Sequence, residues 1–297
     1  MTYRISGTDA AVFEVTPETG RVTMKGSLDR ENKRSLAFTA HVSDGHNEGK
    51  GSMNIIVLDV NDERPEFLDP SYDKSVPENT PTGELLFKVS ATDDDEGDAG
   101  AVRYKIDDVT PKHGFEMFSI GQFNGEVKLT GRLNYTSLST FYRLKINASD
   151  GGGSCGSGPF AVQSNSVFSY ITVEDVADLD PLFINTPYTQ SVEENSAVDI
   201  SVFKVSAIDQ DKGINDDMIY TIEDSKPPGL FKMSQNDGVI SVSSVIDREV
   251  TGDTVTLTLK ATEVNVNIHG IHASTTTTMK VTILDVNDNP PEFYECV

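Results

Sequence analysis

One acidic ten-residue segment occurs three times in the chain. It reads Leu-Asp-Val-Asn-Asp-Glu-Arg-Pro-Glu-Phe at 58–67, Glu-Asp-Val-Ala-Asp-Leu-Asp-Pro-Leu-Phe at 174–183 and Leu-Asp-Val-Asn-Asp-Asn-Pro-Pro-Glu-Phe at 284–293. Crowded carboxylates repel one another, so such oxygen-rich clusters suit a hard divalent cation, calcium above all, which takes about six to eight oxygen ligands. The copies lie more than a hundred residues apart, a spacing that fits whole small β-domains rather than short solenoid repeats.

Three further acidic motifs repeat in the same order, and two of them keep the spacing of 116 residues. They are 93–95 with 209–211, 75–79 with 191–195, and 28–31 with 246–249. Chance similarity between acidic stretches would not preserve both order and spacing, so the chain contains an internal repeat. A length of 297 residues allows two to three domains, and the repeat favours three.

Acidic residues outnumber basic ones by 47 to 24, which gives a formal net charge of -23. A chain this acidic repels nucleic acid and anionic lipid, so neither is an expected partner. A solvated surface explains most of the glutamates and lysines, but it does not explain aspartate clusters at repeat boundaries. No signal peptide and no apolar run of about 18 residues is visible, so we expect a soluble fragment whose anchor lies elsewhere.

Two cysteines and two glycosylation sequons bear on the compartment. Cys155 and Cys296 lie in different repeats and are too few for a disulfide framework, so each is free or pairs outside this chain. Asn134 and Asn147 each begin an Asn-X-Ser/Thr triplet. Such triplets are common by chance. Weak calcium sites, however, would remain empty at the low calcium concentration of the cytosol, so the acidic clusters and the sequons together favour an extracellular location.

Strands are expected wherever apolar and polar residues alternate. The pattern is clearest at 254–261, and equivalent stretches lie at 278–283, 141–146 and 52–57. Turn signals fall at 19–20, 124–125, 150–151 and 237–238. Three stretches that begin with Phe and end with Val or Ile, at 13–22, 118–127 and 231–240, predict hairpins with a buried aromatic ring. The glycine-rich segment 151–158 predicts a flexible loop rather than a phosphate-binding loop. No helical period is sustained, so each repeat is predicted to be an all-β Greek-key sandwich of about seven short strands.

Catalysis is not expected. His269 and His272 suggest a zinc pair, but they lack cysteine or acidic partners at metal-binding spacing, and exposed histidines are the commoner explanation. No Ser, Cys or Lys stands in a nucleophile motif. Small β-sandwich domains arranged in tandem also rarely form the deep pocket that an enzyme needs.

The repeated motifs resemble the signature set of extracellular cadherin repeats, and the resemblance covers the whole chain. It rests on 285–293, on the aspartates ending at Asp95 and Asp211, on Pro-Glu-Asn at 77–79 and on Leu-Asp-Arg-Glu at 28–31. It implies three tandem cadherin-type repeats in an elongated array: 1–64 without its initial strands, 65–180, and 181–290, with 291–297 beginning a linker to a further repeat. Residues 179–181, 211–216 and 292–296 are more narrowly similar to the protocadherin-like, intermicrovillar adhesion branch of the brush border.

In that family each junction between repeats binds up to three calcium ions that stiffen it. The ligands implied for the first junction are Asp29 and Glu31 at an outer site, Asp59, the Val60 carbonyl and Asp62 at shared sites, and Asn61, Asp93, Asp95 and Asp150 on the second repeat. Glu63 and Ala99 stand where the family has asparagine, and they are expected to coordinate through the backbone.

The second junction departs from the family pattern. Leu133-Asn134-Tyr135-Thr136 replaces Leu-Asp-Arg-Glu, which removes two carboxylates, and a glycan on Asn134 would exclude its use as a ligand. Ala177 and Leu179 replace linker asparagines. The ligands that remain are Glu78, Asp175, Val176, Asp178, Asp209, Asp211, the carbonyl of Asn215, and Glu263 in place of an aspartate. Fewer anionic ligands bind calcium more weakly, so we expect an empty outer site, fewer than three ions and a junction that bends more.

A third cluster is complete on its own side. It comprises Glu194, Asp247, Glu249, Asp285 and Asp288. Its other half would belong to a fourth repeat, so we expect the chain to have been cut from a longer array.

The resemblance implies calcium-dependent adhesion between cells or microvilli by the extracellular part of a single-pass plasma-membrane glycoprotein. The implied partner is another cadherin ectodomain in trans. The chain has no tryptophan, which argues against exchange of a Trp-bearing N-terminal strand and favours a heterophilic contact through the first two repeats. The alternative is a mechanical tether in which these repeats are spacers.

Overall fold

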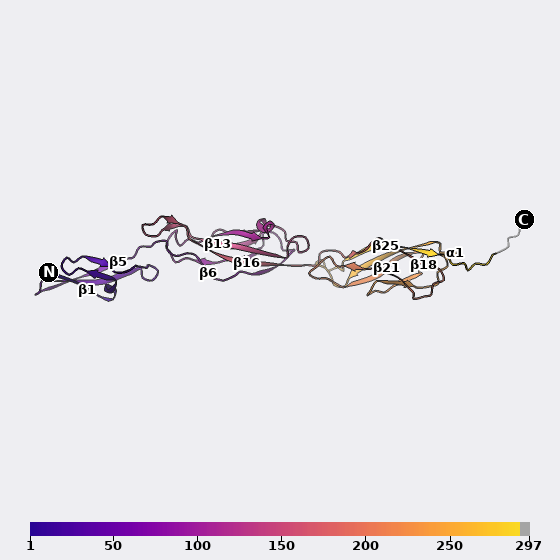
Figure 1. Cartoon of the computed structure of the whole chain (residues 1–297), viewed down its shortest axis with the longest axis horizontal. Coiled ribbons are helices and arrows are strands. Elements are labelled where there is room, and N and C mark those ends of the chain that lie inside the picture. The colour runs from indigo at the N-terminus through magenta and orange to yellow at the C-terminus, as the bar shows by residue number, and fades with distance from the viewer. Residues whose placement is uncertain (292–297) are drawn as a thin grey trace. The chain divides into compact units, whose positions relative to one another are not determined.

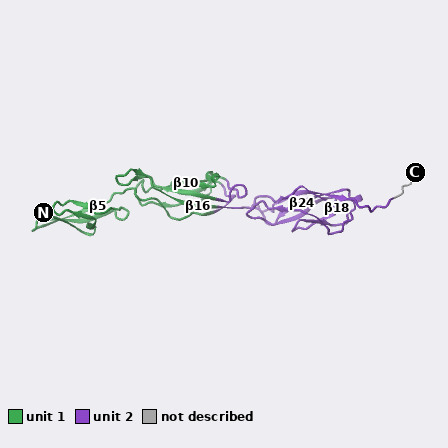
Figure 2. Ribbon diagram, in the orientation of Figure 1, with its two compact units in different colours: residues 1–74, 82–131, 142–171 green, residues 75–81, 132–141, 172–297 purple. Residues whose placement is uncertain are grey.

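The computed structural model describes residues 1–291 as an almost wholly β structure (Figure 1), which confirms the all-β prediction. Three short helical segments interrupt the strands: the 3-10 helices η1 (Thr8–Val12) and η2 (Lys112–Met117) and the α-helix α1 (Arg248–Thr251). None of the helices in this described part is long and apolar enough to cross a membrane. The chain divides into two compact units (Figure 2): residues 1–74, 82–131 and 142–171 form the first, and residues 75–81, 132–141 and 172 onwards form the second.

The first strands of the chain bury a small aromatic core. β1 (Thr2–Ser6), β4 (Ser35–Ser43) and β5 (Glu48–Ile56) form a sheet in the order β1-β4-β5, and β2 (Phe13–Val15) pairs with β3 (Val22–Met24). The rings of Phe13 and Phe38 are centred 5.2 Å apart, and Leu36 is buried beside them. Leu36 and Phe38 lie two residues apart on β4, so both point to the same face of the sheet.

The middle of the chain is built from β6 to β16. Their bounds are β6 (Glu66–Phe67), β7 (Lys74–Pro77), β8 (Leu85–Lys88), β9 (Ala91–Thr92), β10 (Arg103–Thr110), β11 (Phe118–Ile120), β12 (Glu126–Leu129), β13 (Phe141–Ser149), β14 (Gly153–Ser154), β15 (Phe160–Ala161) and β16 (Ser164–Glu174). One sheet has the strand order β10-β13-β16-β7, and another has the order β11-β12-β8. Tyr142, Leu144 and Ile146 alternate along β13 and are fully buried, as the sequence period predicts.

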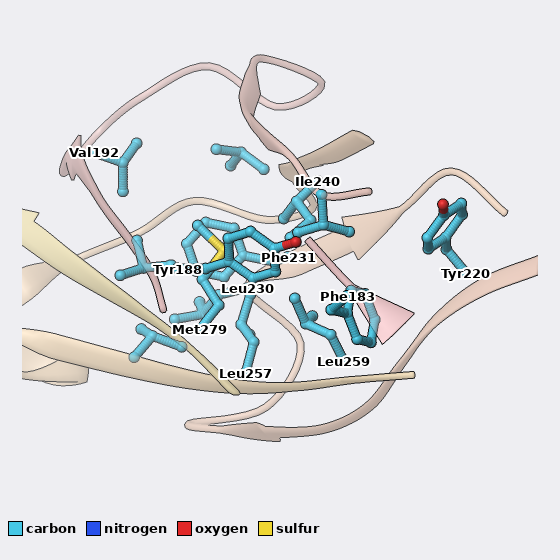
Figure 3. Packing of buried hydrophobic residues seen from close by; sticks show 14 of the residues in the cluster. Phe183, Tyr188, Val192, Tyr220, Leu230, Phe231, Ile240, Leu257, Leu259 and Met279 are labelled. Atoms are coloured by element: carbon cyan, nitrogen blue, oxygen red, sulfur yellow. The ribbon is translucent and has the colours of Figure 1, made fainter. Parts of the chain in front are cut away.

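The last strands enclose a continuous apolar core. They are β17 (Leu182–Phe183), β18 (Tyr188–Glu193), β19 (Ser201–Lys204), β20 (Ala207–Ile208), β21 (Met218–Lys226), β22 (Phe231–Met233), β23 (Val239–Val242), β24 (Thr254–Glu263) and β25 (Ser274–Leu284). They form the sheets β18-β25-β24-β21 and β19-β23-β22, with β18 parallel to β25. Leu257 and Met279 from the first sheet and Phe231 from the second meet in one buried cluster (Figure 3). The sandwich therefore buries one face of each sheet.

The three predicted hairpins are confirmed. They are β2–β3, β11–β12 and β22–β23, and each begins at a buried phenylalanine. Gly20, Gly125 and Gly238 turn the chain in the left-handed region, with φ of 71°, 68° and 68°. A residue with a Cβ is strained in that region, which explains why glycine stands at these turns.

The prediction of a loop over 151–158 is only partly right. Gly153 and Ser154 form β14, which pairs with Ala161 and Phe160 of β15. Glycine lacks the side chain that gives a strand its sequence signal, whereas the pairing depends on the backbone alone. Cys155, in the connection between these strands, is a free and exposed thiol, and Cys296 lies outside the described residues.

We expect Leu257→Ala to destabilise the last repeat by about 2–5 kcal/mol, because Leu257 is fully buried and its truncation leaves a cavity. The neighbouring exposed residue offers a matched control, since Thr256→Ala on the same strand should change stability by less than about 0.5 kcal/mol. Scanning calorimetry of the whole chain measures both. Equal effects of the two substitutions would contradict the assigned strand orientation.

Candidate metal centres

The first carboxylate cluster lies in the first compact unit, on segments that connect strands. Asp29 and Glu31 lie between β3 and β4, residues 59–63 between β5 and β6, residues 93–99 between β9 and β10, and Asp150 directly after β13. Oxygens of Glu31, Asp59 and Asp95 lie within 4.8 Å of one another. The sheets thus act as a scaffold that gathers acidic groups from distant parts of the sequence.

Backbone donors fix one oxygen of each central aspartate and leave the other unsatisfied. The Asp95 N–H donates to Asp93 Oδ1 over 3.1 Å, and the Glu63 N–H donates to Asp95 Oδ2 over 3.3 Å. The second oxygens, Asp93 Oδ2 and Asp95 Oδ1, are buried and have no hydrogen-bond partner. A buried carboxylate oxygen without a partner is costly, so this donor set fits a bound cation that accepts oxygen ligands only.

Two more predicted ligands are held by the β14–β15 hairpin and by the residues that flank it. Asp150 accepts hydrogen bonds from the N–H groups of Gly152 and Gln163, over 2.8 and 3.0 Å. The side chain of Asn61 donates to the Ala161 carbonyl over 3.0 Å. These bonds orient Asn61 and Asp150 in the buried part of the cluster, a supporting role that the glycine-rich sequence did not reveal.

The other residues predicted for this junction lie around the close group. The Asp62 N–H donates to the Val60 carbonyl over 3.0 Å, and Asp62 and Glu63 are exposed. Asp29 Oδ1 accepts the N–H of Asn32 over 2.7 Å. Ala99 is buried.

Arg30 was not among the predicted ligands, yet its side chain is only 4% exposed within this cluster. It forms ion pairs with Glu31 and Asp59, and its Nη1 lies 3.0 Å from Glu96 Oε1. Its Nη2 also donates to the Asp94 carbonyl over 2.5 Å. Arg30 therefore neutralises part of the negative charge. The motif Leu-Asp-Arg-Glu contained this signal, because the arginine stands between two predicted ligands.

The second cluster lies in the other compact unit and centres on Glu78. Glu78 accepts the N–H of Tyr135 at Oε2 over 2.7 Å and the N–H of Val176 at Oε1 over 3.2 Å. Asp175 Oδ2 accepts the Gly213 N–H over 2.6 Å, while Asp175 Oδ1 is buried without a partner. A side chain at residue 213 would place its Cβ 2.7 Å from that of Asp175, so glycine is required for this close approach.

Three buried acids complete the second cluster. Asp209 accepts the N–H groups of Asp211 and Asp216, over 2.7 and 2.6 Å, and Asp211 Oδ2 accepts the Leu179 N–H over 3.2 Å. Asp211 Oδ1 and Glu263 Oε1 are buried without partners. Asn215 adopts a left-handed φ of 56° in the same loop.

Burial and mutual repulsion raise the pKa values of the central acids in both clusters. Burial raises the pKa of Asp95 to about 6, and the charges of Asp93 and Asp59 add to the effect. In the second cluster burial raises the pKa of Asp211 to about 6 and that of Glu263 to about 7. Asp178 contributes repulsion to Asp211, which shows that its charge lies near the group. A divalent cation would relieve the repulsion that produces these shifts.

Asn134 occupies the turn in which the other two repeats place an aspartate. Asn134 Oδ1 accepts the Ser137 N–H over 2.6 Å, just as Asp29 accepts the Asn32 N–H and Asp247 accepts the Val250 N–H. The same capping hydrogen bond is therefore present in all three repeats, and only the third continues as the α-helix α1. The substitution removes a charge from the second cluster without removing the turn.

The third cluster repeats the geometry of the second around Glu194. Glu194 accepts the N–H groups of Arg248 and Val286, over 2.8 and 2.7 Å, and its oxygens lie within 4.8 Å of those of Asp247 and Glu249. Arg248 Nη2 lies 2.7 Å from Asp285, in a position like that of Arg30. Asp288 accepts the side chain of Asn195 over 2.6 Å. Within residues 1–291, neither group of three close ligand atoms includes His269 or His272.

Comparison with known proteins gives matches along the whole chain. The cadherin domain model matches residues 72–165 and 188–284. The chain is 40% identical to cadherin-related family member 2 of Mus musculus and 41% identical to that of Homo sapiens, over 100% of this chain and 23% of each relative. It is 35% identical to Homo sapiens cadherin-23 over 99% of this chain and 8% of that protein. The chain therefore spans about a quarter, or less, of the length of these relatives.

Solved structures show the same architecture. Mouse protocadherin-24 EC1-3 matches with a TM-score of 0.87 and 38% identity, over 96% of this chain and 90% of that one. Mouse cadherin-23 EC22-24 matches with a TM-score of 0.79 and 28% identity, over 96% and 86%. These matches confirm the tandem β-sandwich fold and the kind of repeat, including its protocadherin-like branch, that the motifs predict.

In the metal-free chain we expect stability to fall as the pH rises from about 4 to about 7. Asp95, Asp211 and Glu263 hold a proton more tightly in the folded chain than at their ordinary pKa values of 3.8, 3.8 and 4.5, so the folded state binds more protons across this window. Their ionisation therefore destabilises the fold, and calcium should cancel the loss. Thermal unfolding followed by circular dichroism, with and without calcium, measures this.

Two variants and one control show whether these acids cause the pH dependence. Asp95→Asn and Glu263→Gln should flatten the decline because they remove the titrating groups, whereas Asp69→Asn, at an exposed aspartate, should leave it unchanged. A metal-free stability that rises steadily over this pH range would contradict the assignment of buried, mutually repelling acids.

Proposed function

The chain belongs to the cadherin family, and on that basis we propose that it takes part in calcium-dependent adhesion between cell surfaces. The observation that carries the proposal is the set of buried carboxylate oxygens that lack a hydrogen-bond donor, on Asp93, Asp95, Asp175, Asp211 and Glu263. Oxygen donors of this kind match calcium, and proteins of this family are adhesion proteins rather than enzymes.

The proposed calcium ligands of the first junction belong to two repeats, which we place at 1–64 and 65–180, with a third at 181–290. They are Asp29, Glu31, Asp59, the Val60 carbonyl, Asn61, Asp62, the backbone of Glu63, Asp93, Asp95, the backbone of Ala99, and Asp150. Calcium supplies the positive charge that holds these groups together. Without it, each pair of unit charges about 4 Å apart repels by about 4 kcal/mol at an effective dielectric near 20. The fixed relation of the two repeats therefore depends on calcium.

The second junction is proposed to hold fewer ions than the first. Its proposed ligands are Glu78, Asp175, the Val176 carbonyl, Asp178, Asp209, Asp211, the Asn215 carbonyl and Glu263. Asn134 and Thr136 stand where the third cluster has Asp247 and Glu249, so an outer site lacks two charges. Glu194, Asp247, Glu249, Asp285 and Asp288 are the proposed ligands of the third cluster. Weaker calcium binding at the second junction gives a more pliant connection.

The proposed partner is another cadherin ectodomain in trans, and we favour a heterophilic contact through the first two repeats. Two sequons, Asn134 and Asn147, support an extracellular location on a single-pass membrane protein, with apical microvilli as the site suggested by the motifs at 211–216 and 292–296. In the alternative, the repeats are spacers of an extracellular tether and recognition lies elsewhere in the protein.

Bead aggregation separates these two functions. Beads coated with the chain are mixed with beads of a second colour that carry one candidate cadherin ectodomain, with calcium or with a chelator. Adhesion predicts mixed-colour aggregates in calcium for at least one partner and none in chelator. If beads with this chain remain dispersed against every ectodomain in calcium, the spacer function is supported instead.

A reciprocal exchange of motifs tests the unequal junctions. Asn134→Asp combined with Thr136→Glu restores two carboxylates, so we expect the chain to bind one additional calcium ion, counted by native mass spectrometry. Asp29→Asn combined with Glu31→Thr in the first junction should lose one ion. An unchanged ion count in both double variants would show that these positions are not calcium ligands.

A further inference from the structure

Asn147 lies on the water-facing side of strand β13. The adjacent Ile146 and Ala148 are fully buried, so the Asn147 side chain points away from the core. Ser166 Oγ on β16 donates to Asn147 Oδ1 over 3.2 Å. This bond engages the amide oxygen rather than Nδ2, which is the atom that carries an N-linked glycan.

An exposed aromatic ring lies beside Asn147 on the same face. Phe168 follows Ser166 by two residues on β16 and is 42% exposed. Arg143, on the same side of β13 as Asn147, holds its guanidinium carbon 5.1 Å from the centre of the Phe168 ring. These two contacts place Phe168 between Arg143 and Asn147, within the reach of about 7–8 Å at which diagonal neighbours on a sheet interact.

The fold does not require an aromatic residue at this position. The equivalent position in each repeat lies seven residues before the first aspartate of its acidic segment. The middle repeat has Phe168 there, whereas the first and third repeats have Ser52 and Thr278. Both are exposed on the equivalent strands β5 and β25. A single exposed ring needs no explanation by itself, but here the one repeat with the ring also has the sequon beside it.

We propose that the glycan of Asn147 packs the apolar C–H face of its first sugar against the ring of Phe168. The inference rests on the proposed extracellular location, because this modification is made in the secretory pathway. On attachment, Nδ2 loses a proton and bonds to the anomeric carbon of a sugar, whose bond to a lipid pyrophosphate donor breaks. The electron-rich ring face then attracts the polarised C–H groups, and apolar surface leaves contact with water.

A double-mutant cycle on secreted protein from mammalian cells tests this packing. Ser149→Ala removes the sequon, Phe168→Thr removes the ring, and mass spectrometry of the wild type establishes that Asn147 carries a glycan. We expect Ser149→Ala to lower the melting temperature by roughly 2 °C or more when Phe168 is present, and to have no effect in the Phe168→Thr background. Bacterial protein without glycans provides the control, in which Ser149→Ala should leave the melting temperature unchanged.

The outcomes distinguish this inference from the proposed function. An equal effect of Ser149→Ala in both backgrounds overturns the packing, and so does a Phe168-dependent dimer of the glycosylated chain in sedimentation, because a second copy would then cover the ring. Thr136→Ala removes the other sequon, and its effect should not depend on residue 168. Absence of glycan at both sequons would contradict the extracellular location itself, even if calcium binding persisted.

Discussion

Mutual repulsion among buried carboxylates is the constraint on which this structure depends. Each sandwich is stabilised by an apolar core of ordinary composition, but the segments that leave each core end in acids that face one another. Backbone donors satisfy one oxygen of Asp95 and one of Asp211, and the second oxygen of each has no donor. The fold thus holds negative charge together at a free-energy cost that a bound divalent cation would offset.

The second and third clusters share one geometry and differ in charge. Glu78 and Glu194 accept equivalent pairs of backbone N–H groups, so the base of each site is the same. Arg30 and Arg248 neutralise acids in the first and third clusters, whereas Tyr135 stands at that position in the second. The second cluster has lost both the outer carboxylates and the arginine that faces them. The number of charges available to a cation therefore differs from one cluster to the next.

Much of this organisation was predictable because it repeats in the sequence. Period-two alternation located β13 and β24, and the spacing of the acidic motifs located Glu31, Asp59 and Asp95. Supporting contacts were not predictable, since they depend on backbone groups that every residue has. The pairing of Gly153 with Ala161, which helps to hold Asn61, left no side-chain pattern to read. The burial of Arg30 could not be predicted from the sequence, because it depends on Asp59 and Glu96, which only the fold brings next to it.

Calcium is proposed to bind the carboxylate oxygens that have no hydrogen-bond donor. The most direct measurement is a crystal structure of the chain grown with calcium, with the ions located by anomalous scattering. We expect ions at about 2.3–2.6 Å from Asp95 Oδ1 and from Asp211 Oδ1, with more ions at the first junction than at the second. Density that shows Asp95 Oδ1 and Asp211 Oδ1 bound only to water or to a basic side chain, at saturating calcium, would contradict it.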